Sequence, residues 1–455
     1  MRHISPVLLC IVLVISAYAQ ENSGLVDSRT RTVVIRNVNV IPMDREEVLR
    51  DQTVVIEKGK ITAIGKRVKY PSNAFLVDGS GKYLMPGLAE MHGHVPPIDD
   101  IEPMKDVLAL FAVNGVTTVR GMLGHPRHLE LRDQLNKGDV LGPHFYTTGP
   151  SFNGMSITSP EAGAEAVIRQ KNQGYDYLKL HPGLSRAKFD SIAAAAKRVG
   201  IPFAGHVSFG VGVWRAIEAG YSTIDHLDGF IEGMVPGIEN MSEQETGIFG
   251  MLVADKVDTT QIKKLTAALR KNNIWVVPTQ SLAERWFSPD FKSSAFRSDP
   301  DARYMTTKTV EQWVTSKENL INDPTYKAED VRKFIALRRR LIKACHDEGV
   351  GLLLGCDAPQ VFNVPGFSTH HELRYLVLSG LTPYQALKAG TVNVAKYLNK
   401  PQSGIIRQGA DADLILLNGN PLENIDNSDK IEAVMLKGIW MPPAYRNEVL
   451  KKLEK

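Results

Sequence analysis

The stretch GKYLMPGLAEMHGHV, residues 81–95, sets a run of apolar residues directly before two histidines, His92 and His94, which are one residue apart. In a β-strand, residues two positions apart point to the same side, so both imidazoles can reach one point near the end of this strand. That geometry suits a metal ion. Taken alone, however, the pair fits ordinary polar residues at a strand end more readily, so the rest of the chain has to decide.

The middle of the chain, residues 84–398, alternates short apolar strands with amphipathic helical stretches. Such alternation predicts parallel βα units. Candidate strands lie around residues 87–92, 116–120, 145–148, 177–180, 202–206, 223–226, 275–278 and 351–356. Eight units in a segment of this length favour a barrel with insertions. We therefore predict an α/β fold with a TIM-like (β/α)8 barrel over residues 84–398.

The two ends of the chain share a sequence pattern that differs from that of the middle. Residues 31–83 contain the β-branched runs TVVIRNVNVI and DQTVVIEKGKITAIGK, and residues 399–455 contain GIIRQGADADLILLN and KIEAVMLKGIWM. Short apolar runs separated by turn residues predict small antiparallel strands. Because chain termini tend to lie near each other, we predict that both ends build one small composite β-sandwich domain.

The first residues, MRHISPVLLCIVLVISAYAQ, have the form of a secretory signal peptide. A basic start precedes an apolar core, and Ala17-Tyr18-Ala19 fits the small-x-small cleavage pattern. We predict a signal peptide over residues 1–19, a polar linker over residues 20–30, and an exported protein that is periplasmic or secreted. No later segment reaches about 18 uninterrupted apolar residues, so stable membrane insertion is not expected.

Composition and charge narrow the class of partner. A formal net charge of +4 is small for 455 residues, and no Lys/Arg tract with interleaved aromatic residues is present, which argues against nucleic-acid binding. The densest basic run, residues 332–343, has helical spacing and predicts a solvated helix face. Beyond the signal peptide, Cys345 and Cys356 are too few for a disulfide framework, so we expect buried thiols. The expected partner is a small molecule or dipeptide, and a homo-oligomer is compatible with the sequence.

Three further candidate ligands end predicted strands. His206 ends the fifth in PFAGHV, His226 ends the sixth in YSTIDHL, and Asp357 ends the eighth in GLLLGCDAP. Barrel enzymes place their catalytic groups at the carboxyl ends of the strands. One such residue could be a satisfied core residue, but five at the same end would leave many buried polar groups to pair. Convergence on a functional centre explains the five more simply.

Lys179, in the fourth predicted strand GYDYLKLH, lies between two leucines. Burial of an ammonium ion is costly unless the group is paired or neutralised. A neutral amine can add carbon dioxide and become a carbamate, an anion able to bridge two metal ions. The alternative is a lysine that extends along the barrel to its rim, and the residue by itself favours that alternative.

Motifs along nearly the whole mature chain resemble the amidohydrolase superfamily, in its imidazolonepropionase-related and prolidase-like branch. These motifs occur in the expected order: LMPGLAEMHGHV, NGVTTVRG, DYLKLH, FAGHV, STIDHL, LGCDAP, GLTPYQALKAGTVNVAKYL and GIIRQGADADLILLNGNPLENI. The resemblance implies the fold given above. It also implies that His92, His94 and Asp357 hold one divalent metal ion. The same resemblance implies that His206 and His226 hold a second ion, with a carboxylated Lys179 bridging the two.

The implied cofactors are two divalent metal ions, for which zinc suits imidazole, carboxylate and carbamate ligands best. Two metals lower the pKa of a shared water so that it attacks a carbonyl carbon, and Asp357 would move its proton to the leaving amine. The predicted function is a secreted binuclear hydrolase of amide C–N bonds, acting on dipeptides or N-acyl amino acids. The alternative is a mononuclear aminohydrolase that deaminates a heterocycle. One metal per chain would favour that alternative.

Substrate contacts are less well defined by the sequence. His181 shares a side of its strand with Lys179 and could polarise the scissile carbonyl, or lie at the rim in water. His370 or its neighbour in GFSTHHELRYL could face the site and bind substrate. Residues 284–330 form an insertion that is either part of a lid or a surface decoration. Two positions depart from many relatives: Gly121 stands where aspartate is common, and Cys356 where threonine or serine is common.

Overall fold

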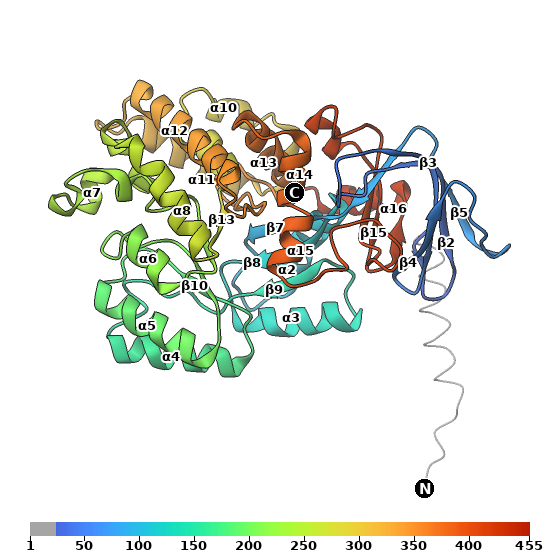
Figure 1. Ribbon diagram of the computed structural model, residues 1–455, viewed down its shortest axis with the longest axis horizontal. Coiled ribbons are helices and arrows are strands. Elements are labelled where there is room, and N and C mark those ends of the chain that lie inside the picture. Colours follow the sequence, from blue (N-terminus) through green and yellow to red (C-terminus); the bar gives the residue numbers. More distant parts are fainter. Residues whose placement is uncertain (1–23) are drawn as a thin grey trace, which may run out of the picture.

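The computed structural model describes residues 24–455, which form a mixed α/β fold. Figure 1 shows a helix-rich part on one side and a sheet that contains the first strands on the other. The predicted signal peptide lies outside the described residues, as does the start of the linker. Within residues 24–455 no helix combines the length and the apolar character that a membrane crossing needs.

Both ends of the chain contribute to one nine-stranded sheet. Its N-terminal strands are β1 (Val26–Asp27), β2 (Val33–Val40), β3 (Leu49–Glu57), β4 (Lys60–Gly65), β5 (Phe75–Asp78) and β6 (Tyr83–Pro86); its C-terminal strands are β14 (Leu414–Leu417), β15 (Ile431–Leu436) and β16 (Ile439–Met441). The two sets meet where β14 runs antiparallel to β6, with Ile415 opposite Met85. Strands from the two ends of the chain therefore lie in one sheet.

The middle of the chain forms two parallel sheets. One consists of β7 (Leu88–Gly93), β8 (Val116–Gly121) and β9 (His144–Thr147). The other consists of β10 (Leu178–Leu180), β11 (Phe203–Gly205), β12 (Thr223–Asp225) and β13 (Trp275–Val277). Each lies within one or two residues of a predicted strand, because these apolar runs are buried on both sides. The parallel α/β class is thus confirmed.

The eighth predicted strand, residues 351–356, makes only a single parallel bridge, from Leu352 to Val276 of β13. On its other side Met91 of β7 donates a backbone hydrogen bond to Leu354 at 2.8 Å. This segment therefore links the two sheets on one side. Gly355 permits this segment to lie close to β7, since a Cβ at position 355 would lie 2.8 Å from the backbone nitrogen of His92. On the other side of the sheets, Tyr177 bridges to Thr148 just after β9.

Helices follow the parallel strands and pack on their outer side (Figure 1). They are α2 (Glu102–Val113), α3 (Pro126–Lys137), α4 (Pro160–Gln173), α5 (Arg186–Val199), α6 (Val213–Ala219), α8 (Ile262–Lys271), α12 (Ala328–Asp347), α13 (Phe367–Leu378), α14 (Pro383–Ala389) and α15 (Val392–Tyr397). Helix α12 carries the basic run, and Arg332, Lys333 and Arg340 are exposed as predicted. Arg338 is an exception, because it is 1% exposed and binds backbone carbonyl groups beside the candidate site.

Two insertions lie on either side of β13. The predicted one contains α9 (Gln280–Leu282), η5 (Ala283–Phe287), α10 (Ser293–Phe296), η6 (Pro300–Tyr304) and α11 (Thr307–Ile321). An insertion between β12 and α8 contains η1 (Glu232–Met234), η2 (Ile238–Asn240), α7 (Glu243–Thr246), η3 (Ile248–Lys256) and η4 (Thr259–Gln261). After β14 the chain adds η7 (Ile425–Asp429) and ends in α16 (Pro443–Leu453).

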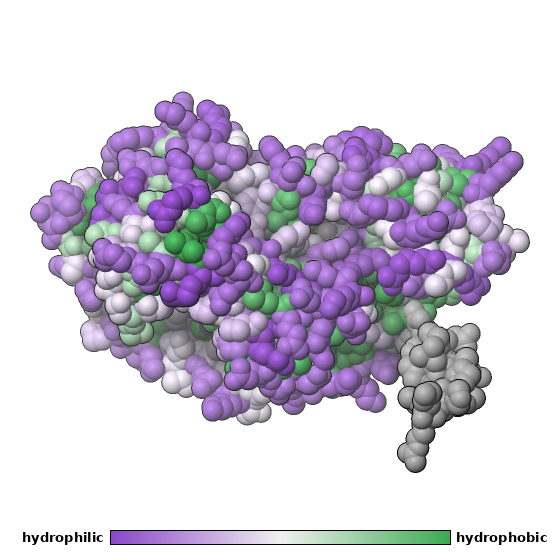
Figure 2. Space-filling view, turned by 90° about the horizontal axis from the view of Figure 1, so that it is seen from below, coloured by the Kyte–Doolittle hydropathy of each residue, from purple (hydrophilic) through white to green (hydrophobic). Residues whose placement is uncertain are grey.

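Cys345 and Cys356 are both free and buried, as expected from their number and surroundings. Most of the face in Figure 2 is hydrophilic, and its hydrophobic groups form small separate patches. Such a surface carries no broad apolar face in this view.

Candidate active site

Six predicted ligands converge at the carboxyl ends of the parallel strands. The set is His92 in β7, His94 just beyond it, Lys179 in β10, His206 directly after β11, His226 directly after β12, and Asp357 after the 351–356 segment. Parallel strands bring their carboxyl ends to one edge, which is why residues far apart in the sequence meet here.

Asp357 lies between the histidines of the first strand and the sixth. Its Oδ1 is 2.7 Å from His94 Nε2 and 3.6 Å from His92 Nε2, and its Oδ2 is 3.9 Å from His226 Nδ1. His92, His226 and Asp357 each offer a ligand atom within 4.8 Å of the others. Imidazole nitrogens and a carboxylate at this spacing suit a divalent cation.

The remaining ligands border the same point. Lys179 Nζ is 3.1 Å from His92 Nε2, and the His206 ring centroid is 4.4 Å from that of His226. The Nε2 atom of His226 is buried and has no hydrogen-bond partner within residues 24–455. A buried polar atom without a partner is costly, so this nitrogen fits a ligand to a bound metal ion.

Burial sets the protonation of the site. Desolvation lowers the pKa of His206 to about 3 and holds the pKa values of His92 and His226 well below their usual range. These imidazoles are therefore neutral at physiological pH, as metal binding requires. Desolvation also lowers the pKa of Lys179 to about 8, although nearby carboxylates oppose the shift. About a tenth of this amine is then uncharged at pH 7.

Asp225 orients His92 and was missed by the sequence analysis. Its Oδ2 accepts a hydrogen bond from His92 Nδ1 at 2.7 Å, which leaves Nε2 facing the centre. Thr223 donates to the same carboxylate at 2.6 Å, and Arg120 Nη2 lies 3.4 Å from it. The available signal was a charged residue inside a short, otherwise apolar strand.

The packing around Arg120 and Gly121 explains why glycine stands at position 121, where many relatives have aspartate. Arg120 is fully buried, and its guanidinium lies 5.5 Å from the Tyr177 ring and 5.7 Å from the Tyr397 ring. Its Nε donates to the Met91 carbonyl at 2.7 Å, so it ties β8 to β7 below the site. A Cβ at Gly121 would lie 2.9 Å from the Phe145 ring, so the present packing requires a small residue there.

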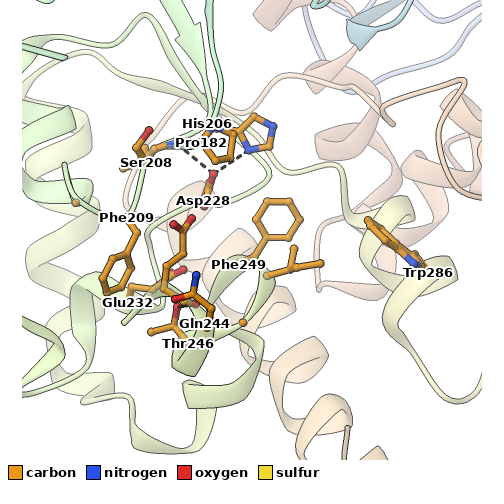
Figure 3. Close-up of a pocket in the computed structure, with 15 residues that line it drawn as sticks. Pro182, His206, Ser208, Phe209, Asp228, Glu232, Gln244, Thr246, Phe249 and Trp286 are labelled. Atoms are coloured by element: carbon orange, nitrogen blue, oxygen red, sulfur yellow. Dashed lines mark hydrogen bonds and ion pairs between the residues drawn. The ribbon is translucent and has the colours of Figure 1, made fainter. Parts of the chain in front are cut away.

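Two further residues support the other histidines. Asp228 Oδ2 accepts from His206 Nδ1 at 2.9 Å, as Figure 3 shows, and also from the Val207 amide at 3.2 Å. Thr279 Oγ1 lies 2.9 Å from His226 Nδ1. Both were missed, because each lies in a loop after its strand and its contact depends on how the loop turns.

Glu90 compensates for the thiol at position 356. It accepts hydrogen bonds from the Cys356 amide at 2.8 Å, from the thiol at 3.0 Å, and from Thr369 at 2.9 Å. Asn363 also donates to the Cys356 carbonyl at 2.7 Å. The backbone before Asp357 is thus held by a buried network that does not depend on a hydroxyl at this position.

Of the two predicted substrate contacts, one lies beside the histidine cluster and the other lies away from it. The His181 ring lies 5.1 Å from the His206 ring, beside the cluster. His370 does not reach the cluster: its Nδ1 is 3.0 Å from Ser428 and its Nε2 is 3.0 Å from the Asn114 carbonyl. Because α13 turns this side chain toward the C-terminal segment, both ring nitrogens are occupied. The substrate-binding role predicted for His370 is therefore inconsistent with the structure.

Comparison with known proteins agrees with this geometry. A family model for the amidohydrolase family matches residues 83–441. The chain belongs to the amidohydrolase family. The predicted superfamily, and with it an enzyme that hydrolyses carbon–nitrogen bonds, is confirmed.

This amidohydrolase is similar to several characterised relatives. Ochratoxinase from Aspergillus niger is 24% identical over 439 residues, covering 87% of this chain and 83% of the relative. Imidazolonepropionase from Idiomarina loihiensis is 22% identical over 404 residues, covering 84% and 90%. A crystal structure of a putative prolidase from Bifidobacterium longum superimposes with a TM-score of 0.67 at 22% identity, covering 93% of this chain and 99% of that one. These likenesses establish a shared fold.

Proposed function

We propose that this amidohydrolase is an exported binuclear enzyme that cleaves the amide bond of dipeptides or N-acyl amino acids. The single observation that carries the proposal is the convergence of six ligand-type side chains. Among them is His226, whose buried Nε2 has no hydrogen-bond partner in the described part of the chain. In the proposed fold, the two parallel sheets and the 351–356 segment form one (β/α)8 barrel over residues 84–398. Residues 31–83 and 399–455 form the sandwich domain.

The donors fit two divalent cations, with zinc as the best match. His92, His94 and Asp357 would hold one ion, and His206 and His226 the other. Bound there, the ions would supply Lewis acidity and an acidified water. Asp225 and Asp228 keep the Nε2 atoms of His92 and His206 unprotonated, because each accepts the Nδ1 proton of its histidine.

Lys179 would complete the set as a carbamate. Its neutral amine attacks carbon dioxide, a C–N bond forms, and the nitrogen loses a proton to leave a carbamate anion. The lysine is fully buried, and desolvation lowers its pKa even though Asp225 and Asp357 lie near enough to oppose the shift. The carbamate would bridge the two ions.

Asp357 is the proposed proton carrier. It lies within reach of His92, His94 and His226, at the centre of the cluster. It would accept a proton from the attacking water and give it to the nitrogen of the scissile bond, which leaves as the amine. His181, beside His206, is placed to contact the carbonyl oxygen of the substrate.

A substrate screen tests the proposal. The metal-loaded enzyme would be incubated with dipeptide and N-acyl amino acid libraries and, in parallel, with purines and pyrimidines, while metal is counted per chain. We expect amide cleavage and two ions per chain. Ammonia release from a heterocycle with one ion per chain would instead establish the alternative, a mononuclear aminohydrolase.

A further inference from the structure

A cavity of about 450 Å³ opens beside His206, between the ends of β10 to β12 and the insertion that follows β12. Ligand pockets typically have volumes in the range of about 300–1,000 Å³. Its walls combine two kinds of side chain. Three carboxylates line it, from Asp228, Glu232 and Glu243, and three aromatic rings, from Phe209, Phe249 and Trp286. No lysine or arginine is among its lining residues.

Phe249 connects this cavity to the candidate active site. Its ring stacks on His206 with centroids 6.0 Å apart and on His226 with centroids 5.4 Å apart. Figure 3 shows Phe249 facing the cavity, with Trp286 on the opposite side from Phe209. A substrate held at the cluster can therefore extend a side chain into this space.

Glu232 supplies the feature that points to a ligand. Its Oε2 is buried and has no hydrogen-bond partner among residues 24–455. In Figure 3 its side chain points toward Asp228, a second carboxylate. Burial raises the pKa of Glu232 to about 8, Asp228 adds to the rise, and Arg338 opposes it.

Arg338, the cation that opposes the rise in the pKa of Glu232, directs its hydrogen bonds elsewhere. The Arg338 guanidinium lies behind Phe249, 5.8 Å from that ring. Its hydrogen bonds go to the His226 carbonyl at 2.6 Å, the Pro278 carbonyl at 2.9 Å and the Gln280 side chain at 3.1 Å. Among the residues that the structure describes, none of opposite charge therefore pairs directly with Glu232.

We infer that this cavity is a specificity pocket for a cationic group on an apolar stem, such as a lysine or arginine side chain adjoining the scissile bond. A bound cation would favour the ionised form of Glu232, whose carboxylate would then accept hydrogen bonds from it. The aromatic walls would pack on the stem and attract the charge through their ring faces. Acidic side chains would be repelled. This inference deepens the proposed function and rests on it for the choice of substrate.

The first test uses matched dipeptides on the metal-loaded enzyme. Ala-Lys is compared with Ala-norleucine and Lys-Ala with norleucine-Ala, so that each pair differs in the ammonium group. We expect a preference for lysine of about tenfold or more in kcat/KM in one of the pairs, in line with a charge-assisted hydrogen bond. Glu232→Gln should remove the preference, while Glu239→Gln, an exposed residue outside the cavity lining, should keep it.

A second test does not depend on hydrolysis. Titration calorimetry on the metal-loaded enzyme would compare n-butylguanidinium with its neutral isostere n-butylurea. We expect the cation to bind about tenfold more tightly, and Glu232→Gln to equalise the two ligands.

The outcomes separate the two claims. Equal binding of cation and isostere by the wild-type enzyme overturns the pocket assignment, even if Glu232→Gln fails to fold. Cleavage of neutral dipeptides as fast as basic ones overturns the specificity and leaves the proposed function standing. If no dipeptide is cleaved, the proposed function fails, and the binding comparison still decides whether the cavity selects cations.

Discussion

Lys179 and Lys317 are both buried, and burial lowers the pKa of each to about 8. In the inserted segment, Lys317 Nζ donates to three backbone carbonyls, of Arg285, Trp286 and Ser288, at 2.7–3.0 Å. At the strand ends, Lys179 Nζ lies 3.1 Å from Nε2 of His92. The two lysines are thus buried alike but have different neighbours. These neighbours favour a structural role for Lys317 and are compatible with the functional role proposed for Lys179.

Replacing Lys179 should give the largest effect. We expect Lys179→Met to lower kcat/KM by roughly 10³-fold, because losing the proposed bridging anion would remove several kcal/mol of metal-based stabilisation. Metal analysis should show fewer than two ions per chain, while the metal-free protein keeps its stability. A variant with full activity and both ions would contradict the bridging role.

Lys317→Met provides the matched control in the other region. We expect the free energy of unfolding to fall by about 3 kcal/mol, since buried carbonyls lose their donor. Below the unfolding temperature, kcat/KM should equal that of the wild type. Denaturant titration and steady-state kinetics measure the two effects, and a loss of activity in the folded variant would contradict the distinction between the two lysines.

Asp225→Asn tests how strongly metal binding at the candidate site depends on the carboxylate that orients His92. We expect metal affinity to fall by about 10–100-fold, because His92 loses the acceptor that fixes its ring and tautomer. Competition with a chelator measures the change. Asp190→Asn, which alters a surface ion pair with Arg215, should leave the affinity unchanged. An unchanged affinity in Asp225→Asn would show that the packing alone orients His92.

His370 extends the comparison to a histidine whose ring nitrogens both have partners. Burial lowers its pKa to about 4, below the value of the unfolded chain, so protonation favours the unfolded state. Its contribution to stability is present above pH 6.5 and is lost as the pH falls toward 4. We expect the metal-free protein to lose about 2 kcal/mol of stability between pH 7 and pH 5 through this group.

The control for His370 is a residue that does not titrate. His370→Gln should show a smaller loss over the same pH interval, and denaturant titrations at both pH values measure it. An identical pH dependence in the variant and the wild type would assign the effect to other groups.

Much of the fold followed from local patterns. Seven of the predicted strands match parallel strands because each is a short apolar run bounded by turns. The 351–356 segment matches its predicted strand less well. Its glycine-containing backbone contacts β7 and β13 but forms no regular ladder of hydrogen bonds with either. The long interval before the seventh predicted strand indicated extra chain after β12, but the elements within it were not predicted, because short 3₁₀ turns have no long hydrophobic period.

The residues of the candidate site likewise fall into those that the sequence predicted and those that it did not. The positions of His92, Lys179, His206 and Asp357 followed from polar residues at the ends of apolar strands and from the family resemblance. Asp228 and Thr279 did not, since their contacts depend on loop paths that no periodicity encodes. His370 was misassigned because a helix residue near the eighth strand can turn to either side.

By itself, the sequence determined the alternation of strands and helices, the pairing of the two termini, and the residues that end each strand. Hydrophobic periodicity and turn chemistry act over a few residues, so these features can be inferred locally. The tertiary structure decided which polar groups have partners. Lys317 has three carbonyl acceptors, whereas His226 Nε2 and Glu232 Oε2 have no hydrogen-bond partner from residue 24 onward. Partnership depends on atoms brought together from distant segments, and only the folded arrangement supplies those distances.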